Sequence, residues 1–150
     1  MNGRKAMAKI SVLVADDNAP IREMLTIALG RQFDVIGCVE NGRQLVDAVL
    51  TREPDVVVSD VWMPVLNGVE ALHILRDYGR TTPFVLVSAD SEVAPHCLKA
   101  GAARFVCKVD LERELAPAVH AAVHSRNWDS RTHADGDLRS RESLRPQPRE

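Results

Sequence analysis

Three aspartates follow apolar runs, where the ends of buried strands are expected. Asp16 and Asp17 come just after residues 10–14 (ISVLV), and Asp60 comes just after residues 56–58 (VVV). Unbroken apolar runs are typical of strands buried on both faces of a parallel sheet. Carboxylates brought within a few ångströms of one another repel, and a hard divalent cation relieves that repulsion. Since the ligands are a few oxygen atoms, Mg²⁺ is the favoured ion.

Two further polar residues follow predicted strands. Ser88 follows residues 83–87 (PFVLV), and Lys108 follows Arg104–Cys107. Carboxylates, Mg²⁺, a lysine and a hydroxyl together suit phosphoryl transfer, in which catalysis is mostly positioning and charge neutralisation. A carboxylate can itself be the nucleophile and form an aspartyl-phosphate. Asp60 is the best placed, because a rigid strand holds it while its carboxylate faces solvent.

Strands and helices are predicted to alternate five times along the chain. Asn18, Asn41 and Asn67 are N-cap residues that precede apolar positions at helical spacing. Pro95 limits where the fourth helix begins, and Pro117 is expected to kink the fifth helix or delay its start. This alternation predicts a doubly wound α/β fold, a parallel five-stranded sheet flanked by five helices. Ligands bind such sheets at the carboxyl ends of the strands, where the polar residues gather.

The composition indicates one soluble domain. The 150 residues are 45% hydrophobic and 27% charged, and the net charge of −2 predicts no strong attraction to nucleic acid or anionic membranes. No apolar stretch is long enough to span a membrane, and the start lacks the apolar core of a signal peptide, so we expect a cytoplasmic protein without membrane insertion. The expected divisions are an N-terminal extension (1–8), the domain (9–124) and a flexible polar tail (125–150).

Four separated motifs resemble those of response-regulator receiver domains, including the chemotaxis type. They are Asp16-Asp17, the DxxMPxxxG pattern from Asp60 to Gly68, Ser88-Ala89, and GAARFVCK ending at Lys108. The resemblance covers roughly residues 9–124. It implies a flavodoxin-like fold with strand order 2-1-3-4-5 and, for a chain of this length, a single-domain response regulator.

The resemblance also implies a role for each acidic residue. Asp60 would accept a phosphoryl group from a phosphohistidine on a sensor histidine kinase or a histidine phosphotransfer protein. Asp17 and Asp60 would bind Mg²⁺ directly, together with the backbone carbonyl of Trp62, and Asp16 would bind it through water. Lys108 would pair with the phosphoryl oxygens.

Two residues would carry the read-out. Ser88 would move toward the phosphoryl group, and Phe105, the switch aromatic, would turn inward and reshape a protein-binding face. Trp62 is hypothesised to slow dephosphorylation by its bulk, whereas Asp90 could speed it by orienting a water. Val109 stands where the family usually has a proline, which leaves open whether the Lys108–Val109 peptide is cis or trans.

Several functions remain open on the sequence alone. A phosphoacceptor switch without separate substrate turnover leads, and its output would be protein contact with an unknown target, because the tail is too short for a DNA-binding module. A phosphorelay intermediate, a phosphate sink and a receiver-shaped module that is never phosphorylated are the alternatives. A phosphatase with an aspartyl-phosphate intermediate is disfavoured, since Trp62 occupies the position where such enzymes have a second acid.

Overall fold

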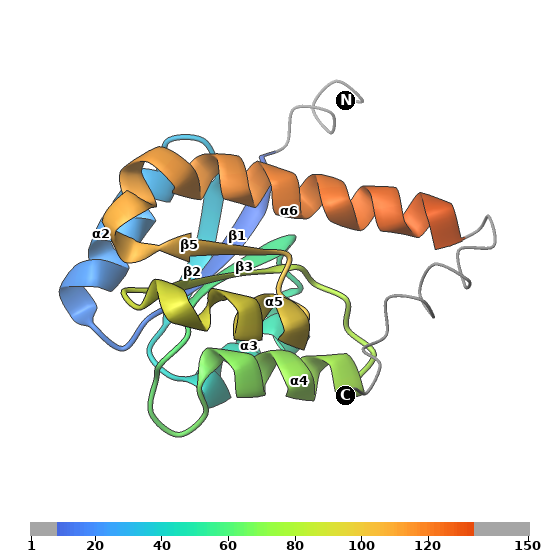
Figure 1. Cartoon of the computed structure of the whole chain (residues 1–150), viewed down its shortest axis with the longest axis horizontal. Coiled ribbons are helices and arrows are strands. Elements are labelled where there is room, and N and C mark those ends of the chain that lie inside the picture. Colours follow the sequence, from blue (N-terminus) through green and yellow to red (C-terminus); the bar gives the residue numbers. More distant parts are fainter. Residues whose placement is uncertain (1–8, 134–150) are drawn as a thin grey trace.

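A parallel β-sheet forms the centre of the molecule, with helices on both faces (Figure 1). The computed structural model describes residues 9–133 of the chain. The strand order is β2-β1-β3-β4-β5, so the predicted topology and fold class are confirmed. The strands are β1 (Ser11–Ala15), β2 (Asp34–Val39), β3 (Val56–Asp60), β4 (Phe84–Ser88) and β5 (Arg104–Cys107).

Five α-helices cover the sheet, as predicted. Side chains of α2 and α6 pack in one apolar cluster on one face, while those of α3, α4 and α5 pack in a second cluster on the other. Two short 3₁₀ turns, η1 (Ser91–Val93) and η2 (Lys108–Asp110), precede α5 and α6. The helices are α2 (Ala19–Gly30), α3 (Gly42–Arg52), α4 (Gly68–Asp77), α5 (Ala94–Ala100) and α6 (Leu111–His133).

The apolar runs of β1, β3 and β4 are buried on both faces, as their patterns predict. Val12 and Val14 of β1 pack in the cluster with α2 and α6, whereas Leu13 and Ala15 pack in the opposite cluster. All four are fully buried. Successive side chains of a strand point to opposite faces, and helices cover both faces of this sheet. The sheet is therefore a rigid platform whose strand ends hold fixed positions.

The three predicted N-caps are confirmed. Asn18 accepts a hydrogen bond from a backbone N–H in the first turn of α2, and Asn41 does the same for α3. Asn67 forms a capping box with Glu70, in which each side chain accepts from the other residue's backbone N–H at 2.8 Å. These caps fix the loops that join the strand ends to the helices.

The fifth predicted helix extends further toward the C-terminus than expected. It starts at Leu111, so Pro117 lies inside α6 and does not delay its start, while the alternative of a kink at Pro117 stays a prediction. The helix also continues through Ser125 to His133, into the range expected to form a polar tail, whose flexibility stays a prediction. The polar residues there include no glycine or proline, and a helix that has formed extends at low cost. The expected extension at 1–8 and residues 134–150 lie outside the described part of the chain.

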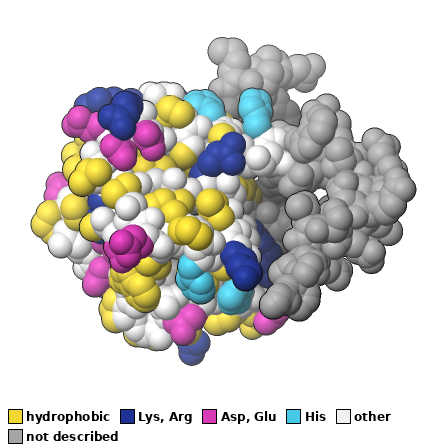
Figure 2. All heavy atoms as spheres, in the orientation of Figure 1, with side chains coloured by type: hydrophobic (Ala, Val, Ile, Leu, Met, Phe, Trp, Pro, Cys, Tyr) yellow, Lys and Arg dark blue, Asp and Glu magenta, His cyan; other side chains and the backbone are white. Residues whose placement is uncertain are grey.

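The surface of the face drawn in Figure 2 mixes acidic, basic and apolar side chains. This mixture agrees with the small net charge of −2. Within residues 9–133, every helix is too short or too polar to cross a bilayer.

Candidate functional site

The three predicted acidic residues meet at the carboxyl ends of β1 and β3. These strands are neighbours, with Ala15 paired to Ser59, so the residues that follow them lie side by side. One carboxylate oxygen from each of Asp16, Asp17 and Asp60 lies within 4.8 Å of the others. Asp16 is fully buried and Asp17 is exposed. Asp60 is 6% exposed, so the expectation that its carboxylate faces solvent is wrong; the carboxylate lies instead against Lys108.

Three hydrogen bonds hold the turn that carries Asp16. Its backbone N–H donates to the carbonyl of Val39 at 3.1 Å, and its Oδ1 accepts from the backbone N–H of Asn18 at 2.9 Å. Its own carbonyl accepts from Nη1 of Arg22 at 2.7 Å. Among the described residues, Oδ2 of Asp16 accepts no hydrogen bond although it is buried, and the one ion pair that it makes, with Nζ of Lys108, is long at 3.5 Å. A buried carboxylate oxygen without a donor is costly, and a cation would satisfy it.

Lys108 places one positive charge against the acidic cluster. Its Nζ lies 3.4 Å from Oδ2 of Asp60 and 3.5 Å from Oδ2 of Asp16. The lysine side chain is 23% exposed, so these contacts are partly shielded from water. The predicted meeting of Lys108 with the acids of two other strands is therefore seen.

The electrostatic surroundings of Asp60 oppose its ionisation. Burial and then the charge of Asp16 raise its pKa above the ordinary value of 3.8. The ammonium of Lys108 and the backbone N–H of Trp62 act in the other direction, but they do not cancel the first two. An added cation at this site would favour the ionised, nucleophilic form of Asp60.

The loop between β3 and α4 is held by backbone hydrogen bonds. The N–H of Leu66 donates to the carbonyl of Pro64 at 2.8 Å, which closes a γ-turn around Val65 at a φ of +70°. The N–H of Gly42, at the start of α3, donates to the carbonyl of Leu66 at 3.0 Å. A Cβ atom on Gly42 would overlap that same carbonyl group. The first turn of α3 thus supports the loop that follows Asp60.

The predicted read-out residues lie on β4 and β5. Ser88 is 2% exposed, and its Oγ accepts from the backbone N–H of Asp90 at 3.1 Å. Ser88 pairs with Cys107 in the sheet register, next to Lys108. Phe105 is partly buried and packs on the cluster that includes α4 and α5. The placement is compatible with the expected switch, whose movement stays a prediction.

The predicted tuning residues differ in their contacts. Trp62 is 57% exposed beside the site. The carboxylate of Asp90 accepts from the backbone N–H of Glu92 at 2.9 Å, so it caps η1. The Lys108–Val109 peptide, which the sequence left open as cis or trans, is trans, like every peptide bond in residues 9–133.

The donor set fits a hard divalent cation. Three carboxylates converge, two of them are buried, and one of the buried oxygens has no donor. Asp16, Asp17 and Asp60 are the residues that would hold Mg²⁺, which accepts a few carboxylates and keeps several waters. Whether Asp16 acts through water, and whether the Trp62 carbonyl joins the set, stay predictions.

A family model described as the response regulator receiver domain matches residues 12–120. The chain belongs to this family. The receiver-domain resemblance is thereby confirmed. The matched range includes all of the sheet except Ser11, the first residue of β1, and it includes each of Asp16, Asp17, Asp60, Ser88 and Lys108.

Two curated relatives match this chain over only part of their own length. The chain is 40% identical over 109 residues to a protein-glutamate methylesterase/protein-glutamine glutaminase of Geobacillus kaustophilus, covering 68% of this chain and 31% of that protein. It is 35% identical over 99 residues to the regulatory protein AtoC of Escherichia coli, covering 65% of this chain and 22% of that protein. The chain therefore spans about a third or less of these relatives' length.

Solved receiver domains have the same fold. The signal receiver domain of NarL from Mycobacterium tuberculosis superposes with a TM-score of 0.73 at 28% identity, covering 78% of this chain and 98% of that one. The response regulator domain of CheB from Thermotoga maritima gives 0.72 at 29% identity, covering 77% and 97%. In both comparisons the matched region covers nearly the whole of the solved domain.

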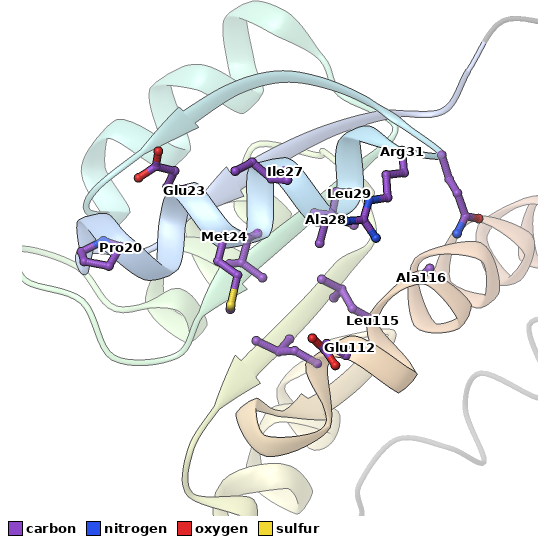
Figure 3. Close-up of a pocket in the computed structure, with 13 residues that line it drawn as sticks. Pro20, Glu23, Met24, Ile27, Ala28, Leu29, Arg31, Glu112, Leu115 and Ala116 are labelled. Atoms are coloured by element: carbon purple, nitrogen blue, oxygen red, sulfur yellow. The ribbon is translucent and has the colours of Figure 1, made fainter.

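A groove of about 760 Å³ lies between α2 and α6, away from the acidic residues. Figure 3 shows Met24 of α2 and Leu115 of α6 pointing into it, with Glu23 and Glu112 at its margins. Met24 and Ile27 are 43% and 59% exposed. None of the predicted site residues lines this groove.

Sequence reasoning missed two residues that support the site. Neither Arg22 nor Gly42 is assigned a role from the sequence. An arginine in the first turn of a helix that follows an acidic pair is a usable signal, because helical side chains lean toward the N-terminus. The contact of Gly42 with Leu66 joins distant segments, and no local pattern predicts it.

Proposed function

We propose that this receiver domain is a phosphoacceptor switch of a two-component signalling system and that Asp60 is the acceptor. The observation that carries the proposal is the set of contacts around Asp60. Its buried carboxylate lies 3.4 Å from the ammonium of Lys108, and carboxylates of Asp16 and Asp17 lie within 4.8 Å. A nucleophile, a cation and a metal-type donor set thus occupy one sheet edge.

The reaction is a transfer between two nucleophiles. An Oδ atom of Asp60 attacks the phosphorus of a phosphohistidine, an acyl–phosphate bond forms, and the P–N bond breaks. The imidazole leaves with the electron pair of that bond, and since its other nitrogen carries a proton, it departs as neutral histidine. The aspartate must be ionised to attack, which is why its raised pKa matters.

Each residue of the cluster has a distinct task in this proposal. Asp16, Asp17 and Asp60 hold Mg²⁺, which supplies charge neutralisation for the transferring oxygens. Lys108 then pairs with a phosphoryl oxygen, from a position already shared between Asp16 and Asp60. Ser88 binds another oxygen after transfer, and Phe105 follows it inward.

The output is a change of surface. Ser88 and Phe105 belong to β4 and β5, which adjoin α5 and α6, so their movement reshapes the face built from α5, β5 and α6. We propose that a sensor histidine kinase or a histidine phosphotransfer protein supplies the phosphoryl group in the cytoplasm and that a downstream protein reads this face. A phosphorelay intermediate or a phosphate sink would use the same chemistry with another output.

Magnesium and beryllofluoride, a phosphoryl mimic, test the proposal. In a Trp128→Phe background, Trp62 is the one remaining tryptophan, so its fluorescence reports the site. We expect Mg²⁺ to change the emission and beryllofluoride to shift NMR signals on α5 and β5. The Asp60→Asn variant should lose the beryllofluoride response. An unresponsive wild type, or an equal response in Asp60→Asn, would contradict the phosphoacceptor function and favour a binding module that is never phosphorylated.

A further inference from the structure

We propose that Arg22 is a positioning residue for the metal-binding pair: its guanidinium fixes the Asp16–Asp17 peptide and thereby holds the Asp17 carboxylate in the acidic cluster. The inference rests on the proposed function, since it concerns the same Mg²⁺ site. It adds Arg22 to the residues that shape the site, beside the three aspartates, Lys108 and Ser88.

The contact is with the peptide that joins the two acids. Nη1 of Arg22 donates to the carbonyl of Asp16 at 2.7 Å, and this carbonyl belongs to the peptide bond between Asp16 and Asp17. A charged donor at this distance makes a strong hydrogen bond. The orientation of that peptide plane determines where the next residue, Asp17, directs its side chain.

Asp17 depends on its neighbours for its position. It is exposed, and it makes no hydrogen bond or ion pair of its own with residues 9–133. Asp16 on one side is fixed by Val39 and Asn18, and Asn18 on the other side caps α2. The backbone alone therefore places the Asp17 carboxylate within 4.8 Å of those of Asp16 and Asp60.

Arg22 is itself anchored to do this. Its N–H donates to the carbonyl of Asn18 at 2.9 Å, and its carbonyl accepts from Oγ1 of Thr26 at 2.8 Å. Helical side chains lean toward the N-terminus, which directs the Arg22 side chain back over the turn. Its partial burial restricts the alternatives open to a long side chain.

Charge and positioning predict opposite results, and this makes the inference testable. A guanidinium near three carboxylates repels an incoming Mg²⁺, so removing its charge would tighten metal binding if electrostatics alone mattered. Removing the anchor would loosen the Asp16–Asp17 turn and weaken metal binding. Positioning groups behind metal ligands commonly change metal affinity by about 10-fold to 100-fold.

The test compares Arg22→Met with Arg31→Met in the Trp128→Phe background. Arg31 is an exposed residue at the other end of α2, so the charge change is matched. We expect Arg22→Met to raise the Mg²⁺ dissociation constant, read from Trp62 fluorescence, about tenfold or more, with no change in Arg31→Met. In metal-free protein, NMR should show faster hydrogen exchange at the Asn18 amide, which donates to Asp16, only in Arg22→Met.

Two further arms keep every outcome decisive. Equal or tighter Mg²⁺ binding in Arg22→Met than in Arg31→Met would overturn the inference. Should Arg22→Met fail to fold, Arg22→Lys decides, because it keeps the charge but lacks the planar fork; weaker binding supports positioning, and wild-type affinity overturns it. A wild type that binds no Mg²⁺ would instead contradict the proposed function. Hydrogen exchange at the Asn18 amide would then still test Arg22: faster exchange in Arg22→Met supports positioning, and unchanged exchange overturns it.

Discussion

Nζ of Lys108 lies 3.4 Å from Oδ2 of Asp60, at the ends of strands separated by β4 in the sheet. The lysine thus partly neutralises a buried carboxylate before any phosphoryl group or metal arrives. The consequences for ionisation, metal binding and phosphorylation can be separated by substitution.

Lys108→Gln should separate phosphorylation from metal binding. We expect the rate of phosphorylation by a small phosphodonor to fall about 100-fold, since a charged donor to the transferring oxygens is lost. Mg²⁺ affinity should stay equal or rise, because a cation has left the acidic cluster. Mass spectrometry measures the rate of phosphorylation, and Trp62 fluorescence measures the Mg²⁺ affinity. A parallel loss of Mg²⁺ affinity would show that Lys108 maintains the structure of the site.

Asp60 should make stability depend on pH in metal-free protein. Because its pKa is raised in the folded state, its ionised form destabilises the native protein at neutral pH. As the pH falls through the raised pKa toward 3.8, the folded protein takes up the proton first, and this destabilisation disappears. We therefore expect Asp60→Asn to be more stable than wild type at neutral pH, with a difference that shrinks as the pH falls.

Urea titrations across that pH range measure the difference in free energy of unfolding. Asp47→Asn, an exposed position with the same charge change, serves as the control. Saturating Mg²⁺ should favour wild type over Asp60→Asn. A wild type that is the more stable protein at neutral pH without metal would contradict the stated direction.

Gly42→Ala should disturb the loop after Asp60 from outside the site. The new Cβ would meet the carbonyl of Leu66, which is backbone and cannot rotate away. We expect a loss of about 1–3 kcal/mol in stability and weaker Mg²⁺ binding. Gly30→Ala is the matched control, because nothing lies within 4 Å of its added Cβ. Similar stability and Mg²⁺ affinity in the two variants would show that the contact does not support the loop.

Trp62→Asn should shorten the life of the phosphorylated state. The indole stands 57% exposed beside the site, where its bulk would hinder water from reaching the acyl phosphate. We expect faster loss of phosphate in the variant, followed after removal of the phosphodonor. A slower loss would refute the hypothesis. Asp90→Ala, tested in parallel, should slow the loss if that carboxylate orients a water.

Much of the fold could be predicted because local signals agreed with the tertiary structure. The runs ending at Asp16 and Asp60 are buried on both faces, and Asn18, Asn41 and Asn67 all cap helices. These are short-range patterns with a direct physical cause. The same patterns predicted correctly that the three acids and Lys108 lie close together, since the carboxyl ends of parallel strands meet at one edge of the sheet.

The parts that were missed depend on non-local or weakly patterned features. Helix α6 continues past Ser125, where the sequence has no apolar periodicity that would predict a helix. An established helix can extend there because each added residue needs only its own backbone hydrogen bond. The contact between Gly42 and Leu66 depends on two loops meeting in space. The Lys108–Val109 peptide could not be assigned from the family pattern, since Val109 departs from it, and the structure gives trans.

Phosphorylation of Asp60 is the central claim, and intact-protein mass spectrometry tests it most directly. Wild type and Asp60→Asn are incubated with a small phosphodonor, each with Mg²⁺ and with a chelator. We predict one added phosphoryl group in wild type with Mg²⁺, little with chelator, and none in Asp60→Asn. No adduct in wild type, or an equal adduct in Asp60→Asn, would contradict the assignment of Asp60 as the phosphoacceptor.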